Sequence, residues 1–398
     1  MKVLSIHNFY GSASPSGEDL VFRAERELLE RNNNDVITFE KYNDEINSLP
    51  RYKKSILPLR LLWSTKTYNQ LRSLIKKERP DIAHFHNIWY LISPSAYYAC
   101  KDAGIPIIQT LHNFRFFCVN GLLMRDSKVC EGCVGSLPWR ALAHGCYRDS
   151  RLYTFPIVIV AASHKYIGTW KNKIDAYIAL TEFGKKKFVE CGLPEKKIFV
   201  KPNFLLNPPK PEYSNDDYVV YLGRLSVEKG LDTLVEAFKK LETLTDDSLV
   251  LKIIGDGPLR KEIVDKIKDG KISNAELTGK KNFAECIRLI KSSRFLIMPS
   301  LCYEGFPMTI REAFACGKPV IASRLGALAE LVEDGKTGLL FEPRNPEDLA
   351  SKIEWMLENK SACVEMGKNA RKVFEEKYTA EKNYEMLMKI YQSVLSSH

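Results

Sequence analysis

Short apolar runs alternate with helix-length amphipathic segments, and this alternation constrains the fold more than any other feature. Strand-like runs are expected at residues 3–6, 36–39, 82–85, 107–111, 177–180 and 198–200. After Gly17, apolar residues recur at helical spacing, at Leu20, Val21, Ala24 and Leu28. Strands that alternate with helices predict parallel βαβ units in a doubly wound α/β sheet.

A proline-rich stretch divides the chain. Residues 202–217 (PNFLLNPPKPEYSNDD) hold four prolines and no periodicity, which is typical of a linker. The rhythm then resumes with strand-like runs at 218–222, 249–254, 295–298, 320–322 and 339–341 and a helix at 231–241. We therefore expect two Rossmann-like domains, residues 1–207 and 208–378, and a last helix over 379–398 that packs back on the first domain.

Composition narrows the class of protein. The chain has 398 residues, 45% hydrophobic and 27% charged, which excludes a disordered or collagen-like chain. The apolar run at 155–162 has eight residues, far below the roughly 20 of a membrane helix. The N-terminus is strand-like and lacks the regions of a signal peptide, so we expect a cytoplasmic protein. Residues 1–200 carry 29 Lys and Arg against 19 Asp and Glu, which accounts for the whole net charge of +10.

Two cations flank a loop that follows the first strand of the second domain. Residues 223–230 read GRLSVEKG, with Arg224 and Lys229 five positions apart between glycines. Arginine binds phosphate oxygens bidentately, lysine binds them as a point charge, and a helix N-terminus adds N–H donors. This pattern is typical of a diphosphate site, although an ordinary βα turn with two solvated cations has the same composition.

A second loop follows the strand at 295–298. Residues 299–313 read PSLCYEGFPMTIREA, with Glu304 in the loop and Glu312 in the helix that Pro307 should open. Glu312 could accept two ribose hydroxyls, and Glu304 could accept hydroxyl protons of a sugar. Two carboxylates eight positions apart are common by chance, so the surrounding sequence carries more information than the spacing.

That surrounding sequence resembles the group-1 retaining glycosyltransferases of GT-B architecture, family 4 among the sequence families. The matching segments in the second domain are 223–230, 255–258 (GDGP), 299–313, 315–322 (ACGKPVIA) and 334–338 (DGKTG), with Gly326 and Glu330. The first domain matches through 80–86 (PDIAHFH), 111–113 (LHN), Thr181 and 202–203. The resemblance implies two Rossmann-like domains that face each other across a cleft.

The resemblance also implies roles for individual residues. Arg224 and Lys229 would bind the donor diphosphate and stabilise it as it leaves, Glu312 would hold the ribose, and Glu304 and His112 would contact the donor sugar. The other donor-binding positions are Gly305, Phe306, Pro307, Met308 and Thr309, with Gly17 where the family has a Gly-Gly pair. No Asp-x-Asp tripeptide is present, and we expect catalysis without a metal cofactor and with retention of anomeric configuration.

Four of the ten cysteines cluster within 29 residues. Cys118, Cys130, Cys133 and Cys146 have the spacing Cys-x11-Cys-x2-Cys-x12-Cys in a loop-like insertion, with His144 as a reserve ligand. Four thiolates can complete a tetrahedral zinc site. A structural zinc knuckle is the favoured interpretation, and an iron–sulfur cluster, free thiols and disulfides remain alternatives.

Residues 51–79 form a basic segment with nine cations, one anion and interleaved Leu, Ile, Trp and Tyr. Such a segment suits an anionic membrane surface, and residues 185–187 (KKK) could extend it. A solvated helix whose apolar stripe packs on the sheet is the alternative. Nucleic-acid binding is not expected, because no RNA-binding aromatic signature accompanies the patch.

Together these features predict a retaining glycosyltransferase that uses a nucleotide-sugar donor. We expect an acceptor that is lipid-linked or an oligosaccharide of a surface polysaccharide, and a peripheral location on the inner face of the cytoplasmic membrane. A nucleotide-sugar epimerase or hydrolase of the same architecture is one alternative. A non-catalytic scaffold that binds membrane or nucleic acid is the other.

Overall fold

The computed structural model describes residues 1–11, 16–50, 57–213, 217–244, 249–269, 272 and 274–398. These residues form two compact units. Unit 1 comprises Met1–Leu123, Cys130–Leu206 and Ala380–His398, and unit 2 comprises Met124–Val129 and Asn207–Thr379. Residues 12–15, which precede Gly17, and the start of the basic segment, residues 51–56, lie outside the described residues.

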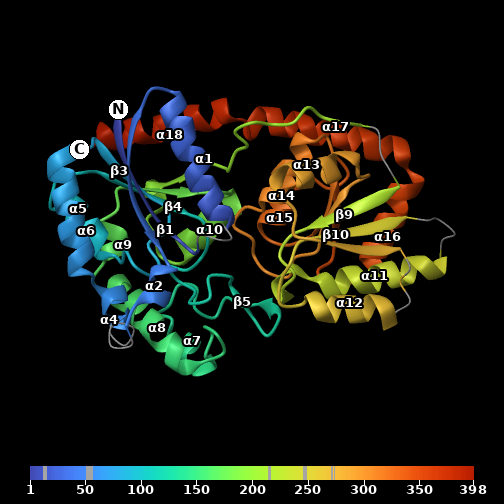
Figure 1. The fold of residues 1–398 in the computed structure, drawn as a ribbon, viewed down its shortest axis with the longest axis horizontal. Coiled ribbons are helices and arrows are strands. Elements are labelled where there is room, and N and C mark those ends of the chain that lie inside the picture. Colours follow the sequence, from blue (N-terminus) through green and yellow to red (C-terminus); the bar gives the residue numbers. More distant parts are fainter. Residues whose placement is uncertain (12–15, 51–56, 214–216, 245–248, 270–271, 273) are drawn as a thin grey trace. The chain divides into compact units, whose positions relative to one another are not determined.

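Unit 1 is built on a six-stranded parallel sheet of order β2-β1-β3-β4-β7-β8 (Figure 1). The central strands are nearly sealed from water, as parallel strands covered on both faces must be. Their short apolar runs are therefore continuous and not alternating. The strands are β1 (Lys2–Phe9), β2 (Asp35–Tyr42), β3 (Ile82–Phe85), β4 (Ile107–Leu111), β7 (Ala176–Ala179) and β8 (Ile198–Val200).

The first helix, α1 (Gly17–Arg31), begins at a capping box. Ser16 Oγ accepts from the Asp19 N–H and the Asp19 carboxylate accepts from the Ser16 N–H. The helix buries Val21, Phe22, Leu28 and Leu29. The prediction that Leu20 belongs to its apolar face is wrong, because Leu20 is 47% exposed. The helix faces the sheet through Val21 and Phe22, one position further along.

Helices complete unit 1, and a small hairpin interrupts its sequence. The helices are α2 (Glu45–Ser48), α4 (Leu57–Leu62), α5 (Thr65–Glu78), α6 (Ser95–Lys101), α7 (Trp139–His144), α8 (Arg151–Tyr166), α9 (Thr169–Asn172) and α10 (Glu182–Glu190), with the 3-10 turn η1 (Glu195–Lys197). The hairpin strands β5 (Met124–Arg125) and β6 (Lys128–Val129) pair antiparallel and group with unit 2. None of the helices among the described residues is both long and apolar enough to span a bilayer.

The last helix, α18 (Ala380–Leu395), belongs to unit 1, 379 residues after the chain begins. Its Leu387, Ile390, Tyr391 and Val394 join Val3, Ile82 and Ile108 of the sheet in one apolar cluster. In Figure 1 it runs as the red helix beside the blue α1. The sheet strands at the start of the chain are thus covered by its end.

Unit 2 has the second six-stranded parallel sheet, of order β11-β10-β9-β12-β13-β14. This is the doubly wound order 3-2-1-4-5-6, in which ligands bind beyond the carboxyl ends of the strands where the order reverses, here between β9 and β12. The strands are β9 (Tyr218–Leu222), β10 (Val250–Ile254), β11 (Ala275–Gly279), β12 (Leu296–Met298), β13 (Val320–Ser323) and β14 (Gly338–Phe341).

Helices cover this sheet around one apolar core, in which Val219, Ile253, Phe295 and Phe341 are among the sealed residues. The sequence did not indicate β11, whose residues AELTG are mostly half-buried and form no apolar run. The helical elements are η2 (Val227–Lys229), α11 (Leu231–Leu244), α12 (Arg260–Asp269), α13 (Phe283–Ser292), α14 (Met308–Ala315), α15 (Ala327–Leu331), α16 (Pro346–Glu358) and α17 (Lys360–Lys377).

The basic segment folds differently from a membrane-inserting helix over its described part. The apolar stripe of α5, with Thr67, Leu71 and Ile75, is buried against α6, so only its cationic side faces water. Lys187 does not extend that patch, because it is largely buried and pairs with Glu131 and Glu190 at 2.8 Å each. The apolar stripe of α5 is thus packed, as the alternative expected, but it contacts the helix α6, whereas the alternative named the sheet.

Candidate active site

The two predicted phosphate and sugar loops of unit 2 follow the two strands at the point where the strand order reverses. The loop 223–230 leaves β9, and the loop 299–307 leaves β12. Lys229 Nζ donates to Glu304 Oε1 at 2.6 Å, which joins the loops by an ion pair. Ser300 Oγ donates to the same carboxylate oxygen at 2.7 Å. Ser300 was not singled out from the sequence, although it lies in the matching segment.

The Lys229–Glu304 pair is partly accessible. The Lys229 side chain is 21% exposed and that of Glu304 is 14% exposed, so both groups border solvent. Burial acts against the charged lysine, but the neighbouring Glu304 carboxylate outweighs it and holds the pKa of Lys229 well above its usual range. Arg224 is exposed at the start of the same loop. The pair therefore offers a fixed cation for an anion and a fixed carboxylate for hydroxyls.

Glycines let these loops approach each other. A Cβ on Gly230 would lie 1.9 Å from the Pro299 carbonyl oxygen, and Gly230 has a φ of +68°. The GDGP segment approaches the first loop in the same way, because a Cβ on Gly257 would lie 2.3 Å from the Leu225 carbonyl oxygen. Leu225 N–H in turn donates to Asp256 O at 3.0 Å. Gly230 and Gly257 thus have a steric reason in this chain, because no side chain fits at either position.

The remaining donor residues lie on or next to α14. Pro307 is the N-cap of the helix and not its first helical residue, so the helix begins one position later than expected. Glu312 is buried, and Arg311 donates to it at 3.2 Å. Burial raises the pKa of Glu312, and Arg311 partly opposes this. The Phe306 ring contacts Tyr378 edge-on, and Thr309 Oγ1 lies 3.5 Å from Met298 Sδ; Gly305 and Met308 complete the segment.

In unit 1, Gly17 is the first residue of α1 and is exposed. The N-terminus of α1 is also occupied by its own acidic side chains. The Asp19 carboxylate accepts from the N–H of the N-cap Ser16, and its Oδ1 lies 2.7 Å from His7 Nε2. Glu18 is buried and hydrogen-bonded to Tyr10 and Asn113. Burial raises the pKa of Glu18 to about 7. A second anion at this helix end would meet these carboxyl groups, so the structure gives Gly17 weaker support than the loops of unit 2.

His112 directly follows β4 and ends a buried chain of polar groups. Its Nε2 lies 3.0 Å from His86 Nδ1, and His86 Nε2 lies 3.2 Å from Glu25 Oε1. Glu25 Oε2 accepts from Lys201 Nζ at 2.9 Å, and Lys201 also donates to Asn383 of α18. Sequence reasoning missed Glu25 and Lys201, because they are 176 positions apart and share no motif.

The contacts of Glu25 define the histidine tautomers. His86 Nε2 and Glu25 Oε1 do not meet in hydrogen-bonding geometry, but the nearby carboxylate stabilises a proton on the nitrogen that faces it, so we assign the proton to Nε2. Burial lowers the pKa of His86 to about 3, so the ring is neutral and its Nδ1 accepts from His112 Nε2. Burial likewise holds the pKa of His112 well below its usual range. His112 is then neutral, with a lone pair on Nδ1 that can accept a hydroxyl proton.

Glu25, His84 and His86 place three potential metal-ligand atoms within 4.8 Å of one another. The ammonium of Lys201 already neutralises Glu25, and His84 is bonded on both ring nitrogens, to Tyr391 Oη at 2.7 Å and Thr110 Oγ1 at 2.8 Å. These contacts satisfy both ring nitrogens of His84, which leaves neither of them available to a metal. The hydrogen bond between Tyr391 and His84 connects α18 to β3.

The four clustered cysteines form no disulfide and are of intermediate exposure. Cys118 Sγ donates to Asn120 at 3.0 Å, and burial together with the neighbouring Cys118 raises the pKa of Cys133. Within the described part of the chain, Glu25, His84 and His86 form the group of three or more ligand atoms within 4.8 Å of one another, and the four thiols do not. His144 is exposed.

Comparisons with known proteins agree with this architecture. Residues 206–373 match the family described as glycosyl transferases group 1, and residues 18–205 match glycosyltransferase family 4. An uncharacterised glycosyltransferase of Methanocaldococcus jannaschii is 31% identical over 342 residues, which cover 84% of this chain and 89% of the relative.

Solved structures show the same fold. The crystal structure of Anabaena HepE in complex with UDP and glucose has a TM-score of 0.67 at 17% identity, with 99% of this chain and 100% of that chain covered. The apo form of the lipopolysaccharide outer core galactosyltransferase WaaB has a TM-score of 0.67 at 17% identity, with 99% of both chains covered. Two parallel Rossmann-like units of this kind form the GT-B fold, and the family follows from the sequence relatives. The chain belongs to the group-1 glycosyltransferases, family 4.

Proposed function

We propose that this enzyme transfers a sugar from a nucleoside diphosphate donor, with retention of anomeric configuration. The observation that carries the proposal is the Lys229–Glu304 pair at the strand-order reversal of unit 2. The donor diphosphate would bind Lys229, and the sugar hydroxyls would donate hydrogen bonds to Glu304. The UDP bound to Anabaena HepE, a protein of the same fold, supports a UDP-sugar as the donor.

In this mechanism the enzyme stabilises charge that develops on the leaving diphosphate. Lys229 and Arg224 supply fixed positive charge, so the proposal needs no divalent metal, and a preorganised partner of this kind contributes about 3–4 kcal/mol to transition-state stabilisation. The leaving phosphate accepts the proton of the attacking hydroxyl on the same face of the sugar. Glu304 orients the sugar and is not a nucleophile, and the Nδ1 lone pair of His112 is available to a sugar hydroxyl.

The test is product analysis with UDP-glucose, UDP-galactose and UDP-N-acetylglucosamine, with and without lipid-phosphate acceptors. Release of UDP coupled to an α-linked glycoside supports retaining transfer. Free sugar or an epimerised nucleotide sugar as the main product would replace the proposal with a hydrolase or an epimerase. If the protein neither binds nor turns over any of these donors, the non-catalytic scaffold alternative would remain.

We propose a lipid-linked acceptor of a surface glycan, used at the inner face of the cytoplasmic membrane. The resemblance of fold to WaaB, which is a lipopolysaccharide galactosyltransferase, supports this class of acceptor. The excess of cations in residues 1–200 supports attraction to an anionic surface. Transfer to a short-chain lipid phosphate and not to the matching free sugar is the expected result.

We also propose that the insertion binds one structural zinc through Cys118, Cys130, Cys133 and Cys146. The Cys-x2-Cys spacing supports the site. Besides burial, Cys118 and Cys130 both raise the pKa of Cys133, which indicates that these three thiols lie near one another. Zinc binding would draw the thiols closer than they lie in this structure, to about 2.3 Å from one ion. Metal analysis of the purified protein should give one zinc per chain, and the zinc should be lost in Cys130→Ser. A purified wild-type protein that contains no metal and is as stable as the same protein with added zinc would reject the site.

A further inference from the structure

Large exposed apolar side chains gather on three helices of unit 1. Among the described residues, eight of the thirteen large hydrophobic side chains that are exposed lie in α4, α7 or α8, or one position after α4 or α8. A protein surface normally scatters such residues, and a concentration of them marks an interaction surface. They are Leu59, Trp63, Trp139, Leu152, Tyr153, Phe155, Tyr166 and Ile167.

Side chains at both ends of α8 are highly exposed, and Tyr166, its last residue, is 87% exposed. Leu152 is 80% exposed and Phe155 is 52% exposed, while Trp139 of the neighbouring α7 is 50% exposed. Helix α8 contacts both α4 and α7, so these residues belong to one region of unit 1. The opposite side of α8 is anchored by Ile157, Val158 and Ala161, which are buried. The exposed residues therefore contribute nothing to the core of unit 1.

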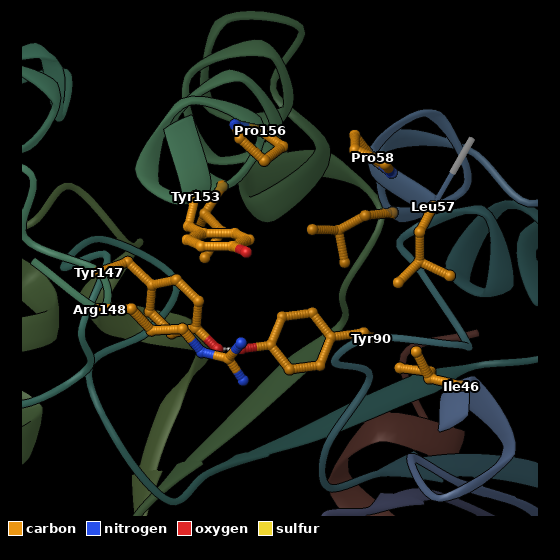
Figure 2. A pocket seen from close by; sticks show the side chains of 10 residues that line it. Ile46, Leu57, Pro58, Tyr90, Tyr147, Arg148, Tyr153 and Pro156 are labelled. Atoms are coloured by element: carbon orange, nitrogen blue, oxygen red, sulfur yellow. Dashed lines mark hydrogen bonds between the residues drawn. The ribbon is translucent and has the colours of Figure 1, made fainter. Parts of the chain in front are cut away.

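A cavity of about 240 Å³ opens between α4 and the first turns of α8. Figure 2 shows that one side of it is aliphatic and the other is formed by tyrosines and an arginine. An apolar cavity of about 150 Å³ accepts benzene, so this one has room for a segment of an apolar chain. Its lining residues are Ile46, Leu57, Pro58, Leu61, Tyr90, Tyr147, Arg148, Tyr153, Pro156 and Ile157.

Positive charge borders the aromatic side of the cavity. The Arg148 guanidinium lies 5.5 Å from the ring centre of Tyr147 and 5.7 Å from that of Tyr153. Arg140, Arg148 and Arg151 are exposed on this side together with one anion, Asp149, whereas the exposed Asp44 and Glu45 precede Ile46 on the aliphatic side. Behind the cavity, Arg115 donates to Tyr90 Oη at 3.1 Å, and Tyr90 and Tyr147 are hydrogen-bonded to each other. An apolar cavity with cations at its rim suits a ligand that has an apolar chain and an anionic head.

We propose that the surface formed by α4, α7 and α8 docks on an anionic lipid bilayer, with the exposed aromatic and aliphatic side chains in the headgroup region and a lipid chain in the cavity. Trp, Tyr and Leu beside Arg are the residues that interfacial helices use for this purpose. The rim charge selects an anionic lipid surface over a neutral one. This deepens the proposed function, since it places membrane contact on α7 and α8, whereas the basic helix α5 buries its apolar stripe.

The experiment is flotation of the full-length chain with vesicles of phosphatidylcholine alone or mixed with phosphatidylglycerol. Wild type should float with the mixed vesicles and much less with the neutral ones. Leu152→Ser with Phe155→Ser removes two exposed apolar groups and should lower the partition coefficient about tenfold or more. The matched control is Phe283→Ser, which removes a 51% exposed ring from unit 2 and should float as wild type does.

The same samples distinguish membrane docking from self-association of the chain through this surface. Quenching of tryptophan fluorescence by lipids brominated on their acyl chains should weaken in Trp139→Phe and weaken further when Trp63→Phe is added, because both side chains enter the bilayer. No flotation of wild type, or equal flotation of the double variant, would overturn docking. A dimer without lipid that dissociates in the double variant would instead make this surface a self-association site and would also overturn it.

The cavity has its own test. Wild type should bind farnesyl phosphate saturably, whereas Leu57→Trp should fill the cavity and bind it at least tenfold more weakly; equal binding would remove the lipid chain from the cavity. UDP binding, measured in parallel, separates the two proposals. Flotation without any response to UDP would retain docking and reject the transferase donor site, and a UDP response without flotation would do the reverse.

Discussion

Two glutamate–lysine ion pairs, one in each unit, have the same chemistry and different surroundings. Glu25 and Lys201 are 2.9 Å apart with both side chains 2% exposed, whereas Lys229 and Glu304 are 2.6 Å apart and border solvent. The buried pair is surrounded by histidines and by Asn383, so no ligand can replace either partner. In the accessible pair, Lys229 can exchange Glu304 for a phosphate, and Glu304 can exchange Lys229 for a hydroxyl. Accessibility, and not the ion pair itself, distinguishes a binding site from a structural contact.

The largest expected effect concerns stability and the buried pair. Glu25→Ala leaves Lys201 charged and unpaired in the interior of unit 1, which should cost about 3–5 kcal/mol of unfolding free energy. Urea denaturation followed by circular dichroism measures this change. The double variant Glu25→Gln with Lys201→Met removes both charges and should recover much of the loss. If Glu25→Ala were as stable as wild type, the pair would carry no structural role.

The next effect concerns turnover and the accessible pair. Lys229→Ala should lower turnover by roughly 10²–10³, as for the loss of one preorganised transition-state partner. Glu304→Gln should lower it as well, while both variants keep wild-type stability within about 1 kcal/mol. Initial rates of UDP release measure the first quantity. Lys266→Ala, which breaks an exposed pair with Asp232 in the same unit, is the control and should remain fully active.

A smaller effect concerns pH. Burial raises the pKa of Glu18 to about 7, from an ordinary value of 4.5. The folded state therefore holds a proton that the unfolded state releases, and Glu18 should lower stability progressively as the pH rises from about 4.5 to 7, by up to about 3 kcal/mol. Glu18→Gln should flatten this part of the stability profile and be more stable than wild type at pH 8. An unchanged profile would show that Glu18 ionises normally.

The subtlest effect concerns the position of one proton. The chain from Glu25 through His86 predicts a neutral His112 protonated on Nε2. Long-range nitrogen–proton spectra of histidine-labelled protein report the tautomer of each of the seven histidines, and His112→Asn assigns the signal. Protonation of His112 on Nδ1 would contradict the proposed direction of the hydrogen bonds.

The sequence predicted much of the fold because buried parallel strands leave short runs dominated by apolar residues, with few polar ones such as His84 and Gln109 among them. The strands at 82–85, 107–111, 198–200 and 218–222 have the expected bounds. It did not predict β11, whose half-buried residues lack such a run, or the exposure of Leu20. In the site, the loops holding Lys229 and Glu304 were predictable because each motif is contiguous. The Glu25–Lys201 pair was not, since its partners meet only when α1, β8 and α18 are assembled.

The central claim is that unit 2 binds a nucleoside diphosphate through Lys229. The most direct test is thermal stabilisation by UDP, GDP, ADP and CMP without added metal, on wild type and Lys229→Ala. A ligand that binds only the folded state raises the melting temperature once its concentration exceeds the dissociation constant. We predict a shift for UDP in wild type that is lost in Lys229→Ala and kept in Lys266→Ala. An equal shift in Lys229→Ala, or no shift with any diphosphate, would contradict the account.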